Sequence, residues 1–539
     1  MNTNTAMEDH MTQLTNISLP RAETPEAAGI SSGVLAALMR EIIDEDLELH
    51  SVMVLRRGLV AYENFRSPYG PDDPHAMFSV SKSITSIAVG LAVEEGLLRL
   101  EDKVADIVPE LRKYDKDPRL EQLQVVHLVS LCAGKNVSGT VDKTKKQWVR
   151  DYAEAAWDYA PGEGWHYCNE NMYMLCVILH RVCGQSVVDY LMPRLFEPLG
   201  IERPYWEHDG LGVEAGGWGI YLKTEDLAKI AQCYLDDGVF RGRQLIPAEW
   251  VQASSSLQRD NSHHTVDGIQ GQYGYGYGFW INTPPGGYRI DGMFSQYALN
   301  FPEYDACVIT TGGDIDHQKV YQTIIRHLPA LFEEGESAEI PGLPAYPPLP
   351  AAPRNTALES RLNSRCVRFL QTLQPIAKAV GFPLSVMPLM VLFMSYDQAG
   401  GIDRVHLRFE EDILKFSWSE GSQRNTVLCG MDGQNRKCKV TLGGEDFVLA
   451  CSAAWEGDQL KIWLRNISSV AARELTFEFR GRAVRLVPRC DPGLDSMVDA
   501  FVGIAKTFVA NKTLGNLIAG LAGPLLHVVE FTHIGYVKG

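Results

Sequence analysis

The stretch FSVSKSITS, residues 78–86, sets a lysine among several serines and runs directly into an apolar segment. The apolar positions recur at helical spacing, at Ile84, Ile87, Ala88, Leu91 and Ala92. This spacing predicts a helix that ends near Gly96. If the helix begins at Ser79, the side chains of Ser79 and Lys82 lie on one face, one turn apart. Either the serines cap a solvated helix, or one of them is a nucleophile.

A serine hydroxyl is a weak nucleophile until a neighbouring group takes its proton. A lysine amine does this only where burial or nearby positive charge favours its neutral form. The start of a helix adds positive potential, and its free amides can bind a developing oxyanion. A serine three residues before a lysine is common by chance, however. The rest of the chain must therefore decide between the two interpretations.

The chain has 539 residues, which predicts two or three domains rather than one core. Its composition is that of a globular protein, with 45% hydrophobic and 22% charged residues. The net charge of −17, with no basic stripe, argues against a nucleic-acid partner.

The 11 cysteines show no metal-ligand spacing, which favours reduced and mostly buried thiols. The N-terminal stretch MNTNTAMEDHMTQLTNISLP lacks the basic and apolar regions of a secretory signal. Together these features predict a cytoplasmic location. The apolar segments 384–395 and 514–530 are shorter than a membrane span and contain proline, so we expect buried segments. The second could instead associate with a surface or a partner. Oligomeric state is not readable from the sequence.

Six prolines in ESAEIPGLPAYPPLPAAPR, residues 336–354, predict a stiff, extended connector. We therefore expect four parts, namely an N-terminal tail over 1–19, a first domain over 20–335, a linker over 336–356 and a second domain over 357–539.

The first domain has strand-like segments at both of its ends. HSVMVLRRGLVAYENF (50–65) predicts a hairpin turning at Arg57-Gly58, after an amphipathic helix over 33–46. GYGYGFWI, YRIDGMF, QYALNF and DACVITTGG predict strands near its end, and the middle is mostly helix and loop. The simplest packing is an α/β (α+β) fold in which one antiparallel sheet, built from both ends, is covered by helices.

The second domain shows short alternating strands from residue 404 onward, separated by turns rich in Gly, Asp and Asn. This pattern predicts a mostly-β meander or barrel. Segments 357–380 and 496–530 are expected to be helical. No catalytic constellation is evident in this domain.

Two further stretches favour the catalytic interpretation of residues 78–86. In PGEGWHYCNENMYM, residues 161–174, Tyr167 and Asn169 are two apart and point the same way in an extended loop. The tyrosine could shuttle a proton, and the asparagine could orient the lysine. In GGYRIDGMFSQYALNFPE, residues 286–303, a Gly-Met pair could offer a backbone N–H to Ser79.

Together these motifs resemble the serine hydrolases related to class C β-lactamases, penicillin-binding proteins, family VIII esterases and 6-aminohexanoate-dimer hydrolase. Further stretches look like family landmarks in family order: TPEAAGISS, ELHSVMVLRRG, HAMFSVSKSITSIAVGLAVEEGLLRLEDKV, GGWGIYLKTEDLAKIAQCYLDDG and YGYGFW. The resemblance covers about residues 20–332. It implies a β-lactamase/transpeptidase-like fold and a cofactor-free hydrolase acting on a small ester or amide.

The resemblance also implies a role for each matching position. Ser79 would be the nucleophile, Lys82 its general base, and Tyr167 a second acid/base. Asn169 would position the lysine and bind substrate. The backbone amides of Ser79 and Met293 would form the oxyanion hole.

The resemblance implies supporting roles near the third motif as well. Gly292 would allow close approach of the backbone. Asp291 and Gln296 are candidate substrate or positioning groups, and His75 is a candidate supporting group.

The sequence departs from the family pattern in the third motif. β-Lactamases of this type carry Lys-Thr-Gly there, but this chain has Arg289-Ile290-Asp291-Gly292, which argues against efficient β-lactam hydrolysis unless Arg289 substitutes. Ser295 stands where relatives have glycine, which could narrow the pocket or shift the strand. Cell-wall peptidases of this family act outside the cytoplasm, so a cytosolic esterase or amidase fits the chain better.

A second serine motif is expected to be a coincidence. GISSG, residues 29–33, matches the nucleophile-elbow pattern, but no strand precedes it, so Ser31 is predicted to cap a helix. His263-His264 stands alone in a polar loop, and no metal or other cofactor is implied.

Several alternatives to a hydrolase remain open at this point. The same residues could serve an acyltransferase, a weak β-lactamase or a D-aminopeptidase. A binding or sensor protein could share the fold without turnover, because fold does not determine function. The second domain could also be the functional part, binding a partner or surface.

Overall fold

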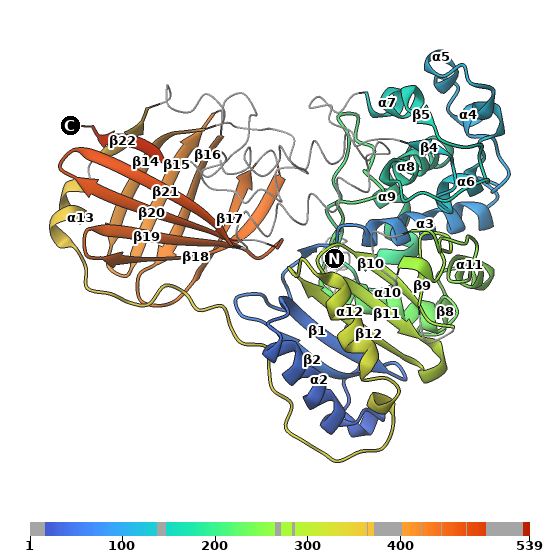
Figure 1. Cartoon of the computed structure of the whole chain (residues 1–539), viewed down its shortest axis with the longest axis horizontal. Coiled ribbons are helices and arrows are strands. Elements are labelled where there is room, and N and C mark those ends of the chain that lie inside the picture. The colour runs from blue at the N-terminus through green and yellow to red at the C-terminus, as the bar shows by residue number, and fades with distance from the viewer. Residues whose placement is uncertain are drawn as a thin grey trace, which may run out of the picture. The chain divides into compact units, whose positions relative to one another are not determined.

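The computed structural model describes residues 17–136, 147–264, 271–282, 286–363, 365–370, 401–421, 423–442, 445–470, 472–491 and 532–538. The chain divides into two compact units, with the boundary between Pro344 and Ala345 (Figure 1). The apolar segments 384–395 and 514–530 and the expected helix over 496–530 lie outside the described residues.

The first unit contains a six-stranded antiparallel sheet in the order β2-β1-β12-β11-β10-β9. Its strands are β1 (Leu49–Arg56), β2 (Leu59–Phe65), β9 (Trp280–Ile281), β10 (Tyr288–Gly292), β11 (Gln296–Phe301) and β12 (Ala306–Gly312). The two ends of the unit join where β1 pairs with β12, for example at Val52 opposite Thr310. The prediction of one antiparallel sheet built from both ends is confirmed.

The hairpin between β1 and β2 turns at the predicted dipeptide. Arg57 and Gly58 both have positive φ, at 54° and 72°. Two such residues in succession make the turn whose twist matches that of paired strands.

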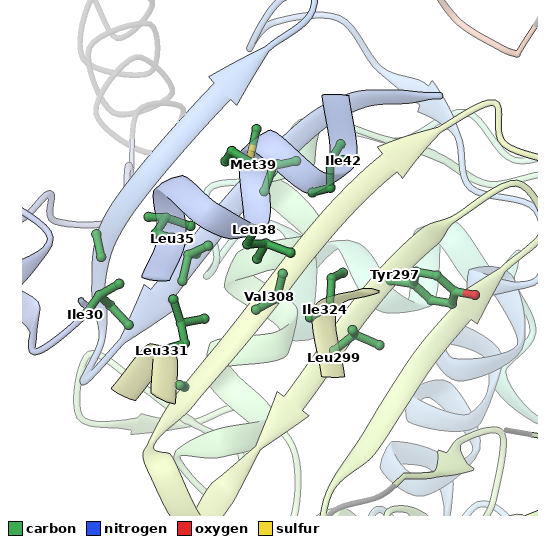
Figure 2. Packing of buried hydrophobic residues seen from close by; sticks show 14 of the residues in the cluster. Ile30, Leu35, Leu38, Met39, Ile42, Tyr297, Leu299, Val308, Ile324 and Leu331 are labelled. Carbon is green, nitrogen blue, oxygen red and sulfur yellow. The ribbon is translucent and has the colours of Figure 1, made fainter. Parts of the chain in front are cut away.

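One face of the sheet is covered by α2 (Ser32–Asp44) and α12 (His317–Arg326) (Figure 1). Helix α2 contributes an apolar stripe formed by Leu35, Leu38, Met39 and Ile42, whose spacing is that of one helix face. Figure 2 shows this stripe over Val308 and Leu299 of the sheet, with Ile324 from α12 beside it. These side chains form the core on that face.

The opposite face is covered by α10 (Thr224–Leu235) and α3 (Val80–Glu94). Successive strand residues point to opposite faces, so Asn300, next to Leu299, points away from α2. Its side chain donates to the carbonyl of Ala231 in α10 at 3.4 Å. Helix α3 is buried on every side from Val80 to Ala92 and packs against β10 and α8 (Asn169–Cys183). The sheet therefore supports the helix that carries Lys82.

Shorter elements complete the first unit. The helices are η1 (Glu26–Ala28), α4 (Val104–Ile107), α5 (Leu111–Tyr114), η2 (Pro118–Gln122), α6 (Val125–Val129), α7 (Trp148–Glu154), α9 (Val187–Leu191), η3 (Met192–Phe196), α11 (Ala248–Ser254), η5 (Pro302–Tyr304) and η6 (Ala330–Phe332). The two-residue strand pairs are β3 (His75–Ala76) with β6 (Tyr221–Leu222), β4 (Lys135–Asn136) with β5 (Ala156–Trp157), and β7 (Val239–Phe240) with β8 (Arg243–Gln244).

The prediction that GYGYGFWI is a strand is wrong for most of its length. Only Trp280–Ile281 joins the sheet as β9. Gly274 and Gly278 have φ of 116° and 80°, conformations that strands do not use. A side chain at Gly278 would meet the backbone of Lys82, since a Cβ there would lie 2.8 Å from its carbonyl oxygen. Gly278 thus allows close packing against α3.

The second unit is a β-barrel, as the alternating pattern predicted. Its sheet has the order β16-β15-β14-β13-β22-β21-β20-β19-β18-β17, and a further parallel bridge joins β16 to β18. Its strands are β13 (Cys366–Phe369), β14 (Ile402–Glu410), β15 (Ile413–Glu420), β16 (Gln423–Gly430), β17 (Arg436–Leu442), β18 (Glu445–Glu456), β19 (Gln459–Asn466), β20 (Ala472–Arg480), β21 (Ala483–Asp491) and β22 (His533–Val537).

Within the described part of the expected helix over 357–380, residues 357–363 and 365–370, only the start is helical. Helix α13 (Thr356–Leu362) is followed by strand β13, which lies between β14 and β22. Val367 and Phe369 alternate with half-buried neighbours, as barrel strands require. The partners that make this segment a strand lie far away in sequence, so a local pattern could not reveal them.

Candidate active site

Ser79 lies at the start of the buried helix α3, where it is the residue that precedes Val80. Phe78 before it has a left-handed φ of 47°, which is strained for a non-glycine residue. The Phe78 ring packs edge-on against Phe294, with centroids 5.1 Å apart. The chain therefore turns sharply into the helix, and Ser79 is half-buried at that turn.

Three other hydroxyls of the opening stretch donate to backbone carbonyls. Ser81 donates to the carbonyl of Phe78 at 2.7 Å, and Ser83 donates to Gly278 at 2.6 Å. Thr85 donates to the carbonyl of Gly216 at 2.9 Å. These bonds tie α3 to two glycine-containing loops, which explains why a buried helix carries so many small polar residues.

Lys82 is buried, with 1% of its surface exposed. Its Nζ donates to Ser79 Oγ at 2.9 Å, to Asn169 Oδ1 at 2.6 Å and to the carbonyl of Gly217 at 2.7 Å. An ammonium group has three hydrogens, and here each has an acceptor. The amine is therefore held against the serine by two fixed oxygens on its other sides.

Gly217 was not singled out by the sequence analysis, although it lies in the quoted landmark GGWGI. A Cβ at this position would lie 2.7 Å from the carbonyl oxygen of Asn169. Only glycine lets this loop reach Lys82 beside the start of α8. The landmark GGWGI pointed to this loop, but Gly217 acts through its backbone carbonyl, which a sequence pattern does not reveal.

Tyr167 lies over Lys82, with Nζ 4.6 Å from the ring centroid. The Trp280 ring stacks on the Tyr167 ring, with centroids 5.5 Å apart and an angle of 24° between the ring planes. Trp280 in turn faces the guanidinium of Arg289 at 5.2 Å from its centroid. These contacts form a column from Arg289 through Trp280 and Tyr167 to Lys82. Trp280 was missed as a site residue because the strand-like GYGYGFWI gave no hint of it.

Arg289 is buried and its charge is already paired. Its Nε donates to Asp291 Oδ2 at 2.7 Å, and its Nη1 donates to Asn282 Oδ1 at 2.9 Å. The structure thus places Asp291 as the partner of Arg289. Within these contacts Arg289 supports Trp280.

The turn after β10 is close to the start of α3. A Cβ on Gly292 would lie 2.3 Å from the carbonyl oxygen of Met77, so the two backbones touch there. Gln296 Nε2 donates to the carbonyls of Met293, Phe294 and Gly312 at 3.1, 3.0 and 2.8 Å. Gln296 therefore holds the three-residue turn that contains Met293.

Ser295 is the last residue of that turn and is fully buried. Its φ of 69° lies in the left-handed region that favours glycine. Its carbonyl accepts a bond from Thr310 Oγ1 at 2.7 Å, but its hydroxyl has no partner among the described residues. Ser295 is thus a strained residue whose hydroxyl is unsatisfied within the described structure.

Cys168 lies between Tyr167 and Asn169 but is not a competing nucleophile. Burial raises the pKa of its thiol, and the nearby Glu170 raises it further. The thiol donates to Glu170 Oε2 at 3.4 Å. A protonated thiol is unreactive compared with a thiolate.

Two other candidates lie away from the Ser79 contacts. His75 is buried, and its Nε2 is 2.9 Å from Nδ1 of His50, which stacks on Tyr69 at 3.8 Å. Ser31 is the residue before α2, and its Oγ accepts a bond from the amide of Val34. Its environment is that of a helix cap. His263 contacts the carbonyl of Trp165 at 3.1 Å.

Within the described part of the chain, no group of three or more His, Cys, Asp or Glu side chains is arranged to hold a metal ion. In the same residues, no single helix is long and apolar enough to cross a membrane. Helix α8 together with the bent segment Val187–Phe196 passes on length and composition alone.

The chain is similar to several known proteins. It is 28% identical over 219 residues to 6-aminohexanoate-dimer hydrolase of Paenarthrobacter ureafaciens, covering 37% of this chain and 55% of that protein. It is 27% identical over 300 residues to penicillin-binding protein 4 of Amycolatopsis lactamdurans, covering 48% and 74%. The chain spans little more than half the length of the first two curated relatives it matches.

Among solved structures, the crystal structure of SurE matches 85% of this chain and 95% of its own, at 18% identity and a TM-score of 0.47. The family model described as Beta-lactamase matches residues 36–311, which include Ser79, Lys82, Tyr167 and the turn at Met293. That match covers more than half of the 539 residues, and the protein belongs to the β-lactamase family.

Proposed function

We propose that this protein is a serine hydrolase that forms an acyl-enzyme on Ser79 with a small ester or amide. The observation that carries the proposal is the contact of 2.9 Å between the buried Nζ of Lys82 and Ser79 Oγ. A general base must lie within hydrogen-bond reach of the proton that it takes, and this pair meets that requirement.

Lys82 serves as the base in its neutral form. A neutral amine keeps two hydrogens, which Asn169 Oδ1 and the Gly217 carbonyl accept. Its lone pair then faces Ser79, whose hydroxyl donates to it. Asn169 and Gly217 thus orient the base as well as holding it, and the hydroxyl oxygen becomes a nucleophile as its proton leaves.

Tyr167 is the second proton carrier in this proposal. Its ring lies over Lys82 and is braced by Trp280, so its hydroxyl is confined to the neighbourhood of the base. Protonation of the leaving alcohol or amine requires a group that can receive the proton from Lys82 and pass it on.

The amides of Ser79 and Met293 bind the oxyanion. Ser79 begins a helix whose terminus favours negative charge, and Met293 follows the glycine that touches Met77. Gln296 holds the Met293 carbonyl and so fixes the orientation of this turn.

The test is intact mass and peptide mapping after exposure to a fluorophosphonate. We expect one adduct on Ser79 in the wild type and none in Ser79→Ala. Ser31→Ala is the matched control, because it removes another buried serine at a helix start, and it should label fully. Folded wild-type protein without an adduct, or labelling that survives in Ser79→Ala, would reject the proposal. A panel of small esters and amides then defines the substrate.

A further inference from the structure

The barrel of the second unit closes at a seam between β16 and β17. Within the described strands, β16 pairs with β15 along its length. On the opposite side from β15, β16 has one described bridge, from Gly430 to Ser452 of β18. Strand β17 pairs with β18 along its length. The edges of β16 and β17 therefore face each other at the seam.

Two side chains take the place of a backbone ladder there. Asn425 on β16 donates to the carbonyl of Thr441 at 2.9 Å and accepts from its amide at 3.2 Å. Cys438 on β17 does the same for Leu428, since Sγ accepts from its amide at 3.2 Å and donates to its carbonyl at 3.6 Å. Side chains thus satisfy backbone groups at an open strand edge. We call Asn425 and Cys438 the two fasteners of the seam, and one of them is a thiol.

Three thiols from three strands meet at this seam. The bridge between Gly430 and Ser452 sets Cys429 beside Cys451 on the neighbouring strand. Arg436 lies opposite Cys451, so Cys438 is two residues further along and on the same face. Cys429 and Cys438 both raise the pKa of the Cys451 thiol, so the three sulfurs lie within interaction range of one another. Cys429 and Cys451 are buried, whereas Cys438 is partly exposed.

The thiols differ in their charge state. The hydrogen bond from Cys451, with help from the Leu428 amide, lowers the pKa of Cys438 to about 6. Burial raises the pKa of Cys451 well above its ordinary value. Cys438 is thus the accessible thiolate, and Cys451, diagonal to it on β18, is a protonated thiol. A low-pKa thiol beside a second cysteine is the arrangement of an oxidation-sensitive site.

We propose that Cys438 and Cys451 form a peroxide-sensitive thiol pair whose oxidation unfastens the barrel seam. In the first step the Cys438 thiolate attacks hydrogen peroxide, an S–O bond forms, the O–O bond breaks, and hydroxide leaves. In the second step Cys451 sulfur attacks the resulting sulfenic acid. The S–S bond forms, the S–O bond breaks, and the Cys451 proton leaves with the hydroxyl as water. Two cysteines are oxidised by two electrons, and one peroxide is reduced.

The disulfide weakens the seam because of what Cys438 does in the reduced protein. A disulfide sulfur is a weaker acceptor for the Leu428 amide than the Cys438 thiolate is. Asn425 then remains as the fastener between β16 and β17. The expected consequence is faster hydrogen exchange at Leu428 in the oxidised chain.

The experiment treats the full chain with hydrogen peroxide and maps its peptides by mass spectrometry. In the wild type we expect the peptides of Cys438 and Cys451 to be joined with the loss of two hydrogens. Cys366, half-buried on β13 with a raised pKa, is the matched reference thiol in the same barrel. We expect Cys438 to react roughly fivefold faster than Cys366 because of its larger thiolate fraction.

Cys451→Ser and Cys438→Ser test the two steps separately, so a folding defect in one variant does not decide the outcome. In Cys451→Ser the reaction should stop at Cys438 with a gain of one oxygen, trapped by a sulfenic-acid reagent. In Cys438→Ser the disulfide should be lost, whereas Cys366→Ser should form it normally. Oxidation of Cys366 before Cys438, or a wild-type chain that keeps Cys438 and Cys451 unlinked while other cysteines oxidise, would overturn the proposal.

Discussion

Lys82 illustrates how much of this site depends on a single buried side chain. Its amine has three oxygen acceptors within 2.9 Å, from Ser79, Asn169 and Gly217. A lysine held only by structural acceptors would be an ordinary buried cation, but one of these acceptors is a half-buried serine hydroxyl at a helix start. This arrangement supports our proposal that Lys82 acts on Ser79.

The substitution Lys82→Met keeps the length and apolar stem of the side chain but removes the amine. We expect the rate of acylation by an activated ester to fall about 10²- to 10⁴-fold, the usual contribution of a general base. The measurement is single-turnover kinetics with intact mass. Lys229→Met is the control, because Lys229 is also buried but lies on α10 with Asp226. Equal losses of acylation in both variants would argue that Lys82 is only structural.

Ser295 carries a second prediction at this scale. Glycine relieves the left-handed φ of 69° and removes a buried hydroxyl that has no partner in the described structure. Against this, glycine adds about 0.5–1 kcal/mol of backbone entropy to the unfolded chain. We expect Ser295→Gly to raise the free energy of unfolding of the first unit by about 1 kcal/mol. Urea denaturation measures it, and Ser295→Ala, which keeps the strain, should gain less. A destabilised Ser295→Gly would contradict this account.

At the scale of elements, the sequence predicted those whose partners are near or whose periodicity is strong. The β1–β2 hairpin, α2, α3 and the alternating barrel strands all have patterns readable within one element. Strand β13 and the loop at Gly278 were misread, because distant segments decide them. β13 is a strand through β14 and β22, and Gly278 is shaped by contact with α3.

The same limit applies to the candidate site. SxxK and YxN spacing brought Ser79, Lys82, Tyr167 and Asn169 into view, because these roles belong to side chains at short spacings. Gly217 and Trp280 were not found. One acts through its backbone carbonyl, and the other acts through stacking on Tyr167 from a strand more than 100 residues away. Tertiary contacts of these kinds leave no local pattern.

Strand β22 carries a prediction on pH. Burial, and secondarily the charge of Arg473, lowers the pKa of His533 to about 4 from an ordinary value near 6.5. A base whose folded pKa is lowered gives full stability above its unfolded pKa, and this stability is lost as the pH falls from about 6.5 towards 4. Between pH 7 and pH 5 we expect the barrel to lose about 2 kcal/mol.

Hydrogen exchange of barrel amides in the full chain, measured at the two pH values and corrected for intrinsic rates, tests this expectation. His533→Gln should flatten the pH dependence, whereas His406→Gln, at an exposed position on β14 of the same barrel, should keep it. A wild-type barrel that is equally protected at both pH values would contradict the assignment to His533.

At the scale of the whole molecule, the proline-rich segment does not act only as a spacer. Its first part contacts the first unit, where Leu343 enters the core and its amide donates to Asn64 at 2.8 Å. Arg66 donates to the carbonyl of Pro344 at 2.8 Å. Its second part contacts the barrel, where the amide of Leu349 donates to Ser452 at 3.0 Å. Each half of the segment thus belongs to a different unit.

This division predicts where the chain can be cut. We propose that the first unit carries the chemistry and that the barrel is an accessory, so a chain ending at residue 346 should still acylate Ser79. A chain ending at residue 335 loses the Leu343 side chain from the core and three hydrogen bonds to the β2 end of the sheet, with Tyr62, Asn64 and Arg66. It should be less stable by about 3 kcal/mol, from about 2 for the buried leucine and the rest for the bonds. Fluorophosphonate labelling and urea denaturation of both chains measure the two effects. Equal stability would place residues 336–344 outside the folded unit, and loss of labelling in the longer, folded chain would show that the barrel takes part in the reaction.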